Sequence, residues 1–332
     1  MSEKILALFK ILNLKIDWNN SKLKKVGRGR KWKFNLRPII FCSLLFVLKK
    51  FTSSYELINY LNDNRNPEAA DFRRLCGFDK LGIPNRRTLE RRFSKIQRYL
   101  RLVIQKIGKV LVKMRIVKIA GRVVDATTTV ADGNVWHKKQ KQQGIIPACG
   151  NIDQEAEWGK NSQGWKYGYK AHLFASIKPI CVPLDIMVTT ANFADDTVYE
   201  ELTETLIQDN EYTLADSRYD SAKLYEATKT KGCRLIAGVN KRTGKIASKV
   251  RQKLVKFLKT NKGKKLYRER SISIEPTNRH FKNLFPGLKR AVVKRLKNIS
   301  LYWHSSTLIY QLAVIYNFNM KRALKHIKSV IY

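Results

Sequence analysis

The hydrophobic pattern of the first third of the chain is helical. Apolar residues recur every three or four positions through Tyr55–Leu61 and again through Leu100–Val112. This spacing places them on one face of a helix, where they can pack against a core. The pattern predicts an all-helical N-terminal domain over residues 1–118.

Glycine and proline interrupt the helical pattern between residues 70 and 98. Gly77, Gly82 and Pro84 break it, and Asn85 can cap the helix that follows. The helix that follows Asn85 is rich in arginine, and two interpretations of it stay open. It is either the DNA-facing helix of a helix–turn–helix or part of a bundle with a solvated basic face. On the first interpretation, its DNA-binding residues are Arg86, Arg87, Arg91 and Arg92.

From residue 119 the period changes to that of β-strands. GRVVDATTTV is short and β-branched, and apolar and polar residues alternate over 165–173 and over 182–188. A helical segment follows, then the strand that ends at Asp216, a helix over 221–231 and the apolar strand CRLIAGV. This order predicts a mixed sheet of five strands with helices packed on it, and further helices toward the C-terminus.

Two stretches lack this pattern. Residues 126–164 are too long for a structureless loop in a compact domain, so they either become ordered on a ligand or contain an unrecognised element. Residues 241–270 carry thirteen Lys or Arg and one acid, Glu269. This composition predicts a solvated basic segment that faces DNA.

The charge of the whole chain indicates a polyanionic partner. Its 66 Lys and Arg residues outnumber 26 Asp and Glu, a formal net charge of +40. Solubility does not require such a surplus, and the surplus destabilises the folded chain by self-repulsion. Nucleic acid offsets this repulsion because neutralised phosphates release counterions. We therefore expect nucleic acid rather than an acidic membrane surface.

The cysteines and the apolar runs indicate a cytoplasmic protein. Five cysteines are scattered singly with no C-x-x-C pair, which argues against a zinc knuckle and a disulfide framework. The longest apolar run, Ile39–Leu48, has about half the residues that a membrane-spanning helix needs. We expect no membrane association.

Acids at strand ends stand out in so basic a chain. Asp125 follows Val123 and Val124 at the expected end of the first strand, and Asp216 ends the fourth. If these strands are parallel neighbours, the two carboxylates lie side by side, and one pKa rises unless a cation lies between them. Mg²⁺ suits this place because it is a hard ion that prefers oxygen ligands.

Glu275 is the candidate for a third carboxylate. Pro276 suits the first position of a helix, which would make Glu275 its N-cap with the side chain near the sheet. Asn278, Arg279 and Lys282 follow at helical spacing on roughly the same face. Taken singly, each acid is more simply a cap or turn residue. Together the three favour a metal site beside phosphate-binding bases.

Five segments, in this order, resemble bacterial and archaeal insertion-sequence transposases of the DDE type. They are VVDATTTV, WKYGYKAHLFA, TTANFADDTVYEEL, YTLADSRYDS and YRERSISIEPTNRHFK. The resemblance covers about residues 120–320 and is to the insertion-sequence-four/five group, which a Tyr–Arg–Glu–Lys signature marks. It implies a ribonuclease-H-like mixed five-stranded sheet flanked by helices, over 119–332 with the basic segment 241–270, preceded by the helical domain.

The resemblance also implies the site residues. Asp125, Asp216 and Glu275 correspond to the catalytic acids and would bind two Mg²⁺ or Mn²⁺ ions. Four residues separate Arg270 from Glu275 where the family has three, and Glu269 is the alternative third acid. The residues expected to clamp DNA phosphates or a displaced base are Tyr267, Arg270, Arg279 and Lys282.

The function that the resemblance implies is that of a transposase. It would bind the terminal inverted repeats of its mobile element as a homodimer on double-stranded DNA and catalyse metal-dependent cleavage and transfer to target DNA. The expected location is the prokaryotic cytoplasm, at the nucleoid. Two alternatives stay open: a metal-dependent DNA nuclease that cuts without joining, and a catalytically inactive, transposase-derived DNA-binding protein.

Overall fold

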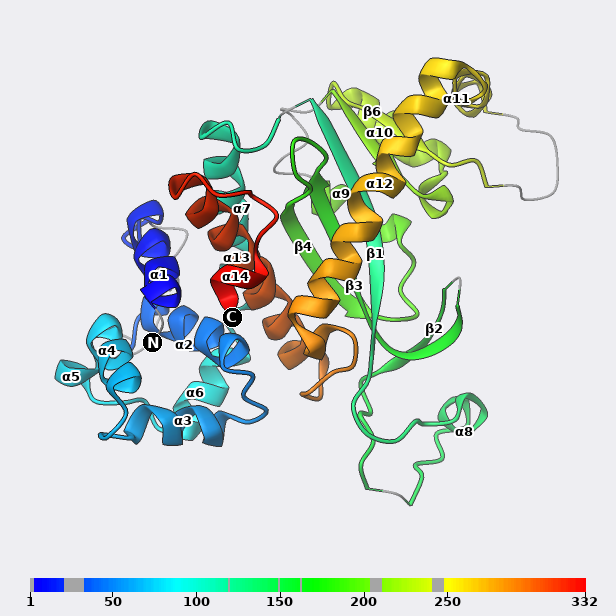
Figure 1. The fold of residues 1–332 in the computed structure, drawn as a ribbon. Coiled ribbons are helices and arrows are strands. Elements are labelled where there is room, and N and C mark those ends of the chain that lie inside the picture. The colour runs from blue at the N-terminus through cyan, green and yellow to red at the C-terminus, as the bar shows by residue number, and fades with distance from the viewer. Residues whose placement is uncertain are drawn as a thin grey trace. The chain divides into compact units, whose positions relative to one another are not determined.

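The computed structural model describes residues 3–20, 33–118, 120–148, 150–161, 163–203, 211–240 and 248–332. The chain forms two compact units. The helical unit comprises Met1–Ile107 and Ala291–Tyr332, and the sheet unit comprises Gly108–Arg290 (Figure 1). The boundary expected from the sequence, at 118/119, stays a prediction. The two compact units divide between residues 107 and 108, and the last 42 residues belong to the helical unit.

The core of the helical unit is built on two apolar helices. Most side chains of α2 (Leu36–Leu48) and α13 (Leu296–Asn319) are buried, as expected for helices that are apolar on nearly all sides. The two helices pack on each other, and α13 also contacts α1 and α6. The other helices of this unit are α1 (Glu3–Lys15), α3 (Ser54–Asn62), α4 (Pro67–Cys76), α5 (Phe78–Leu81), α6 (Arg86–Phe93) and α14 (Lys328–Ile331), and α7 (Gln97–Lys113) runs from this unit into the next.

The turn between α4 and α6 has the chemistry expected from the sequence. Gly77 ends α4 in the left-handed conformation with φ 74°, which glycine adopts without steric cost. Asn85 caps α6, because its side chain accepts a hydrogen bond from the backbone nitrogen of Thr88 at 2.8 Å. The predicted cap is therefore confirmed.

The sheet unit contains a mixed sheet of six strands. The strands are β1 (Gly121–Val130), β2 (Glu157–Asn161), β3 (Gly164–Ser176), β4 (Pro183–Thr190), β5 (Tyr212–Ala215) and β6 (Arg234–Ala237). The order is β2-β3-β1-β5-β6, with β4 also paired to β3. β3 is antiparallel to β1, β2 and β4, whereas β5 is parallel to β1 and β6. The predicted fold class, a mixed sheet flanked by helices, is confirmed.

The predicted number of five strands is wrong because of β2. This strand, EWGKN, lies inside the stretch 126–164 that shows no periodicity. It is short and polar, and residues Glu157–Asn161 form a strand because they pair with β3, not because of their own β-propensity. The stretch therefore contained an unrecognised element. The short helix α8 (Lys138–Gln142) lies in it as well.

Helices cover the sheet. α9 (Tyr199–Thr203) packs on β3 and β4, α10 (Ala222–Thr230) on β6, and α12 (Asn261–Leu284) across β1 and β5 (Figure 1). Short 3₁₀ turns are η2 (Asp196–Val198), η3 (Ser217–Tyr219) and η4 (Pro286–Leu288). None of the described helices is long and apolar enough to cross a bilayer.

The basic segment 241–270 is helical where the structure describes it. Residues 241–247 lie outside the described residues, and the rest forms α11 (Lys249–Lys259) and the start of α12. α11 packs on α10 and α12 and buries Leu254. The other residues of α11 are exposed or half-buried, as expected for a solvated segment, and the prediction that the segment faces DNA stays a prediction.

Candidate active site

Asp125 on β1 and Asp216, directly after β5, lie in equivalent register on neighbouring parallel segments. The pairing of β1 with β5 joins Gly121 to Tyr212 and Val123 to Leu214, an offset of 91 positions. The same offset separates Asp125 from Asp216. Parallel strands lie about 4.8 Å apart, so the two backbones are adjacent. The expected pairing of the first and fourth strands is thereby confirmed.

The expectation that the first strand ends at Asp125 is wrong. β1 continues to Val130 because its other edge stays paired with β3, where Asp125 lies opposite Leu173. Asp125 marks the place where β5 has ended and β1 has lost its parallel partner. Its side chain therefore lies at the edge of the β1–β5 pairing, and only 11% of it is exposed.

Burial raises the pKa of both carboxyl groups. The pKa of Asp125 rises to about 6, chiefly because its charged form is desolvated; Asp216 adds to the rise and Arg270 opposes it. Burial also raises the pKa of Asp216. One oxygen of Asp216 accepts a hydrogen bond from the backbone nitrogen of Arg218 at 2.9 Å, which caps η3. Asp216 is thus a cap and a member of the acid pair at once.

Glu275 lies in the middle of α12 rather than at its start. The helix begins at Asn261 with Thr260 as N-cap and contains Pro276 in its interior, so the predicted N-cap role of Glu275 is wrong. Proline costs a helix one hydrogen bond and a steric clash. Tertiary packing overcomes this cost here, because Ile274 and Phe281 are fully buried on either side of the proline.

Arg270 joins the first and third acids. Its Nη2 donates to Oδ1 of Asp125 at 3.0 Å and its Nη1 to Oε1 of Glu275 at 3.2 Å. The guanidinium is buried on α12, and the nearby charges of Asp125 and Asp216 raise the pKa of Arg270 against the opposite effect of its desolvation. In this structure the cation that contacts Asp125 is therefore an arginine, and it joins Asp125 to Glu275.

Two further polar groups of α12 reach β1. Asn278 donates from Nδ2 to Oδ2 of Asp125 at 2.8 Å. Lys282 donates from Nζ to the carbonyl of Thr128 at 2.7 Å, and burial lowers its pKa to about 8. The expectation that these residues share the face of Glu275 is consistent with these contacts, since they reach the same strand one and two turns further along.

Tyr267 and Glu269 differ in their distance from the acids. The phenol of Tyr267 lies against Gly238, where an added Cβ would be 2.5 Å from its oxygen. Burial raises the pKa of Tyr267, and the charges of Asp216 and Asp125 add to the rise. Glu269 forms an ion pair with Lys178 and accepts a hydrogen bond from the hydroxyl of Tyr212 at 3.3 Å. Glu275, not Glu269, shares Arg270 with Asp125.

The remaining predicted DNA-binding residues are surface arginines, with one exception. Arg279 is exposed on α12, and Arg86, Arg87 and Arg91 are exposed on α6. Arg92 is buried with Leu89 and Phe93 on the packed face of α6, so the prediction that its side chain is presented to DNA is wrong.

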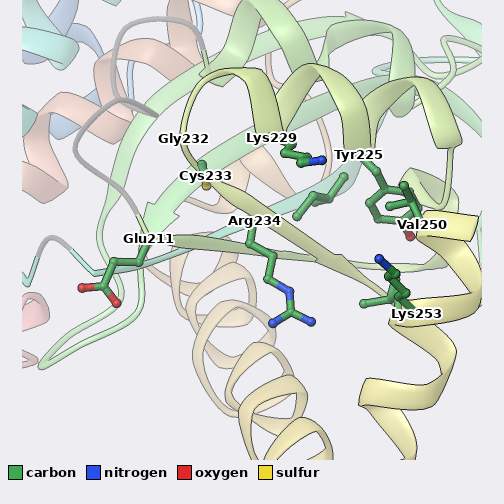
Figure 2. A pocket seen from close by; sticks show the side chains of 10 residues that line it. Glu211, Tyr225, Lys229, Gly232, Cys233, Arg234, Val250 and Lys253 are labelled. Atoms are coloured by element: carbon green, nitrogen blue, oxygen red, sulfur yellow. The ribbon is translucent and has the colours of Figure 1, made fainter.

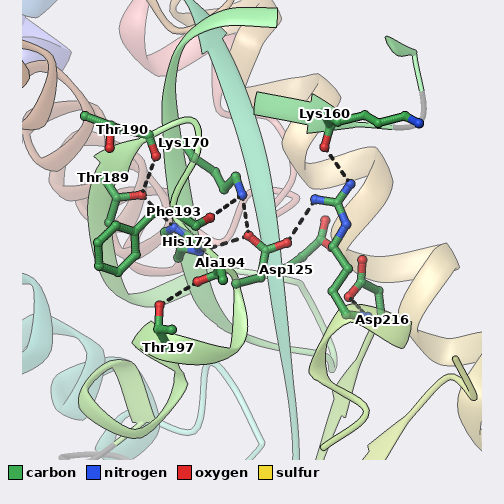
Figure 3. Close-up of polar contacts among 12 residues, drawn as sticks. Asp125, Lys160, Lys170, His172, Thr189, Thr190, Phe193, Ala194, Thr197 and Asp216 are labelled. Carbon is green, nitrogen blue, oxygen red and sulfur yellow. Dashed lines mark hydrogen bonds and ion pairs between the residues drawn. The ribbon is translucent and has the colours of Figure 1, made fainter. Parts of the chain in front are cut away.

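The sequence did not indicate the role of Asp195. Asp195 directly precedes η2, but its side chain makes no capping hydrogen bond to that turn. Instead Asp195 is buried between Lys170 and Arg218, both of which donate to it (Figure 3). The signal for this role lies in the structure and not in the sequence: Lys170 is buried on β3, and a buried cation requires an anion.

A separate cavity lies away from these acids. It has a volume of about 510 Å³ and is enclosed by β6, α10 and α11 (Figure 2). Apolar side chains such as Leu235 and Val250 line it, together with the cations Lys229, Arg234 and Lys253. None of the candidate catalytic residues lines it, so the cavity does not mark the candidate active site.

The donor set around Asp125 suits a hard divalent ion. In the part of the chain that the structure describes, no three His, Cys, Asp or Glu side chains converge closely enough to hold a metal. The guanidinium of Arg270 lies between two of the three acids. Beside them the amide oxygen of Asn278 is buried without a hydrogen-bond partner. Three carboxylates and this oxygen are the ligand types that Mg²⁺ prefers.

Comparison with known proteins identifies the family. No curated protein matches the chain significantly. Among solved structures, the chain is similar to the piggyBac transposase in a synaptic complex with hairpin DNA, with 12% identity and a TM-score of 0.45. This similarity covers 100% of this chain and 76% of that one. The sequence model of the family described as "Transposase DDE domain" matches residues 118–312, more than half of the chain. The chain belongs to the transposase DDE domain family.

Proposed function

We propose that this protein is a transposase that cleaves DNA at the ends of its mobile element and joins them to target DNA. One observation carries the proposal: Asp125 on β1 and Asp216 directly after β5 lie in equivalent register, and Arg270 of α12 bonds both Asp125 and Glu275. A pair of neighbouring acids, with a third acid that shares Arg270 with Asp125, suits the chemistry of phosphodiesters in a chain of net charge +40.

Asp125, Asp216 and Glu275 would hold two divalent ions, Mg²⁺ or Mn²⁺, with the free amide oxygen of Asn278 as a further ligand. When bound, such ions lower the pKa of an attacking water and stabilise the leaving oxygen of a phosphodiester. The chain itself supplies the ligand geometry: β1 and β5 fix two acids, and α12 fixes the third.

The basic residues of α12 would bind and orient the DNA. Arg270 and Lys282 lie next to Asp125 and carry charges that suit phosphate, and Arg279 is exposed on the same helix. Tyr267 lies beside Asp216 and offers an aromatic ring for a displaced base. On this proposal, double-stranded DNA is the partner, and two copies of the chain hold the two ends of the element.

Two variants test the proposal together with a matched control. Asp125→Asn and Asp216→Asn should each lower metal-dependent cleavage of DNA that carries the element's ends by more than about 100-fold. Changes in residues that merely support metal ligands already cost 10–100-fold. Affinity for the same DNA, measured by gel shift, should stay within about twofold because counterion release is unchanged. Asp132→Asn serves as the control.

The result also separates the proposed transposase from its rivals. Cleavage with no joined products would favour a nuclease. Unchanged cleavage in both variants would refute the proposed catalytic acids, and DNA binding without any cleavage by the unaltered chain would favour an inactive DNA-binding protein.

A further inference from the structure

Asp195 is a fourth acid close to the candidate catalytic acids. It follows β4 in the loop before η2, and 1% of its side chain is exposed. Its charge contributes to the raised pKa of both Asp125 and Asp216. A buried carboxylate in this position is costly unless cations and hydrogen bonds compensate its charge.

Two cations compensate Asp195, one on each carboxylate oxygen. Lys170 donates from Nζ to Oδ1 at 2.8 Å, and Arg218 donates from Nη1 to Oδ2 at 3.0 Å (Figure 3). Lys170 also donates to the carbonyl of Phe193 at 2.7 Å, which fastens the loop of Asp195 to β3. His172 lies near, with Nδ1 3.7 Å from Oδ1, but its burial lowers its pKa to about 4, so it is neutral at pH 7.

Arg218 connects this ion pair to Asp216. Its backbone nitrogen donates to Oδ1 of Asp216 at 2.9 Å, so the position of Arg218 sets the position of that carboxylate. Both terminal nitrogens of its guanidinium are bound: Nη1 donates to Asp195, and Nη2 donates to the carbonyl of Lys160 in β2 at 3.0 Å (Figure 3). Asp195 and β2 therefore anchor the turn that carries Asp216.

We propose that Asp195 is a positioning residue for Asp216 and acts through Arg218. The inference rests on the proposed function and deepens it, because it names the contact that holds one of the candidate metal ligands in place. The hydrogen bonds of Asp195 with side chains go to Lys170 and Arg218, so its effect on Asp216 would be indirect. Loss of its charge releases the guanidinium of Arg218, lets the η3 turn shift and weakens divalent-ion binding.

The neighbouring acid provides a matched control. Asp195→Asn and Asp196→Asn are compared in the full-length chain by circular dichroism melting, by Mn²⁺ binding in electron paramagnetic resonance, and by the Mn²⁺ dependence of cleavage. We expect Asp195→Asn to weaken Mn²⁺ binding by about 10- to 100-fold, the range for residues that orient metal ligands. Asp196→Asn should stay within about twofold of the unaltered chain.

A second variant covers the case in which Asp195→Asn does not fold. Arg218→Gln leaves the ion pair of Asp195 with Lys170 intact and changes a side chain that is 41% exposed. It should weaken Mn²⁺ binding as much as Asp195→Asn. If Asp195 acts through Arg218, the double variant should lose no more than either single variant, because coupled residues are not additive.

Several outcomes would overturn the inference. Normal Mn²⁺ binding in folded Asp195→Asn or in Arg218→Gln would do so, and so would losses that multiply in the double variant. Asp125→Asn distinguishes this failure from failure of the proposed function. If Asp125→Asn abolishes Mn²⁺ binding while the variants at 195 and 218 bind normally, only the positioning role is refuted. If Asp125→Asn also binds and cleaves normally, the proposed function fails.

Discussion

Arg270 donates a hydrogen bond from Nη2 to Oδ1 of Asp125 at 3.0 Å, across 145 positions of the sequence. The same guanidinium reaches Glu275, so one buried cation holds two of the three candidate metal ligands. A guanidinium and a divalent ion cannot occupy this place together. Ion binding therefore requires Arg270 to move, and it frees the guanidinium for phosphate.

Removal of Arg270 should strengthen metal binding in the absence of DNA. A charge-assisted hydrogen bond contributes roughly 1.5–3 kcal/mol, and its loss removes the competition for Asp125. Arg270→Ala should raise Mn²⁺ affinity by about tenfold or more, measured by paramagnetic resonance on the DNA-free protein. Arg268→Ala, an exposed arginine on the same helix, should leave it unchanged. Weaker Mn²⁺ binding in Arg270→Ala would instead make Arg270 a support of the site.

Gly238→Ala should displace Tyr267 without disturbing the sheet. The added Cβ would lie 2.5 Å from the hydroxyl oxygen of Tyr267, the far end of a flexible side chain, and 3.4 Å from the nitrogen of Ser217. A displacement of about 1 Å at an active site can cost roughly 100-fold in rate. Cleavage should fall toward the level of Tyr267→Ala, with little change in melting temperature. Gly150→Ala, where an added Cβ meets nothing within 4 Å, is the control. Equal cleavage by Gly238→Ala and Gly150→Ala would argue against a role for Tyr267.

His304 should make the helical unit sensitive to acid. It is buried on α13 and donates from Nδ1 to the carbonyl of Ser300 at 2.6 Å; burial lowers its pKa to about 4 from an ordinary 6.5. Between these values the unfolded chain binds a proton that the folded chain does not. The contribution of neutral His304 to the free energy of unfolding is therefore complete above pH 6.5 and is lost as the pH falls to about 4. It amounts to at most roughly 3 kcal/mol.

The variant His304→Gln isolates this effect. The difference in free energy of unfolding between the unaltered chain and the variant should shrink as the pH falls from about 6.5 to about 4, measured by denaturant titration. A difference that stays constant over this range would show that His304 is not held neutral by burial.

Pro276→Ala should stabilise α12. Proline cannot donate the helical hydrogen bond to the carbonyl of Ile272, and it costs a helix interior about 3 kcal/mol relative to alanine. The variant should raise the melting temperature by several degrees in calorimetry, provided that the surrounding helix keeps its course. Ile272→Ala, at a side chain that is 64% exposed, should change it little. A lower melting temperature for Pro276→Ala would show that the packing of α12 depends on the proline.

Local periodicity and turn residues made much of the secondary structure predictable. Five of the six strands and the Asn85 cap follow from alternation, apolar runs and turn residues, because these features act over a few neighbouring positions. The predicted parallel pairing of two strands also placed Asp125 beside Asp216. Local reasoning also named Glu275, and the family resemblance added Tyr267 and Arg270.

What the sequence determined by itself is the local order of helices and strands and the acids that end or interrupt them. Tertiary structure alone decided that β2 pairs with β3, that α12 continues through Pro276 and that Arg92 is buried. It also decided which cation meets which acid: Arg270 binds Asp125, and Lys170 and Arg218 bind Asp195. The physical reason is that each of these cations is 23 or more positions from its acid in the chain, so no local period encodes the pair. Packing brings the two side chains together, and the cost of burying an unpaired charge selects the pair.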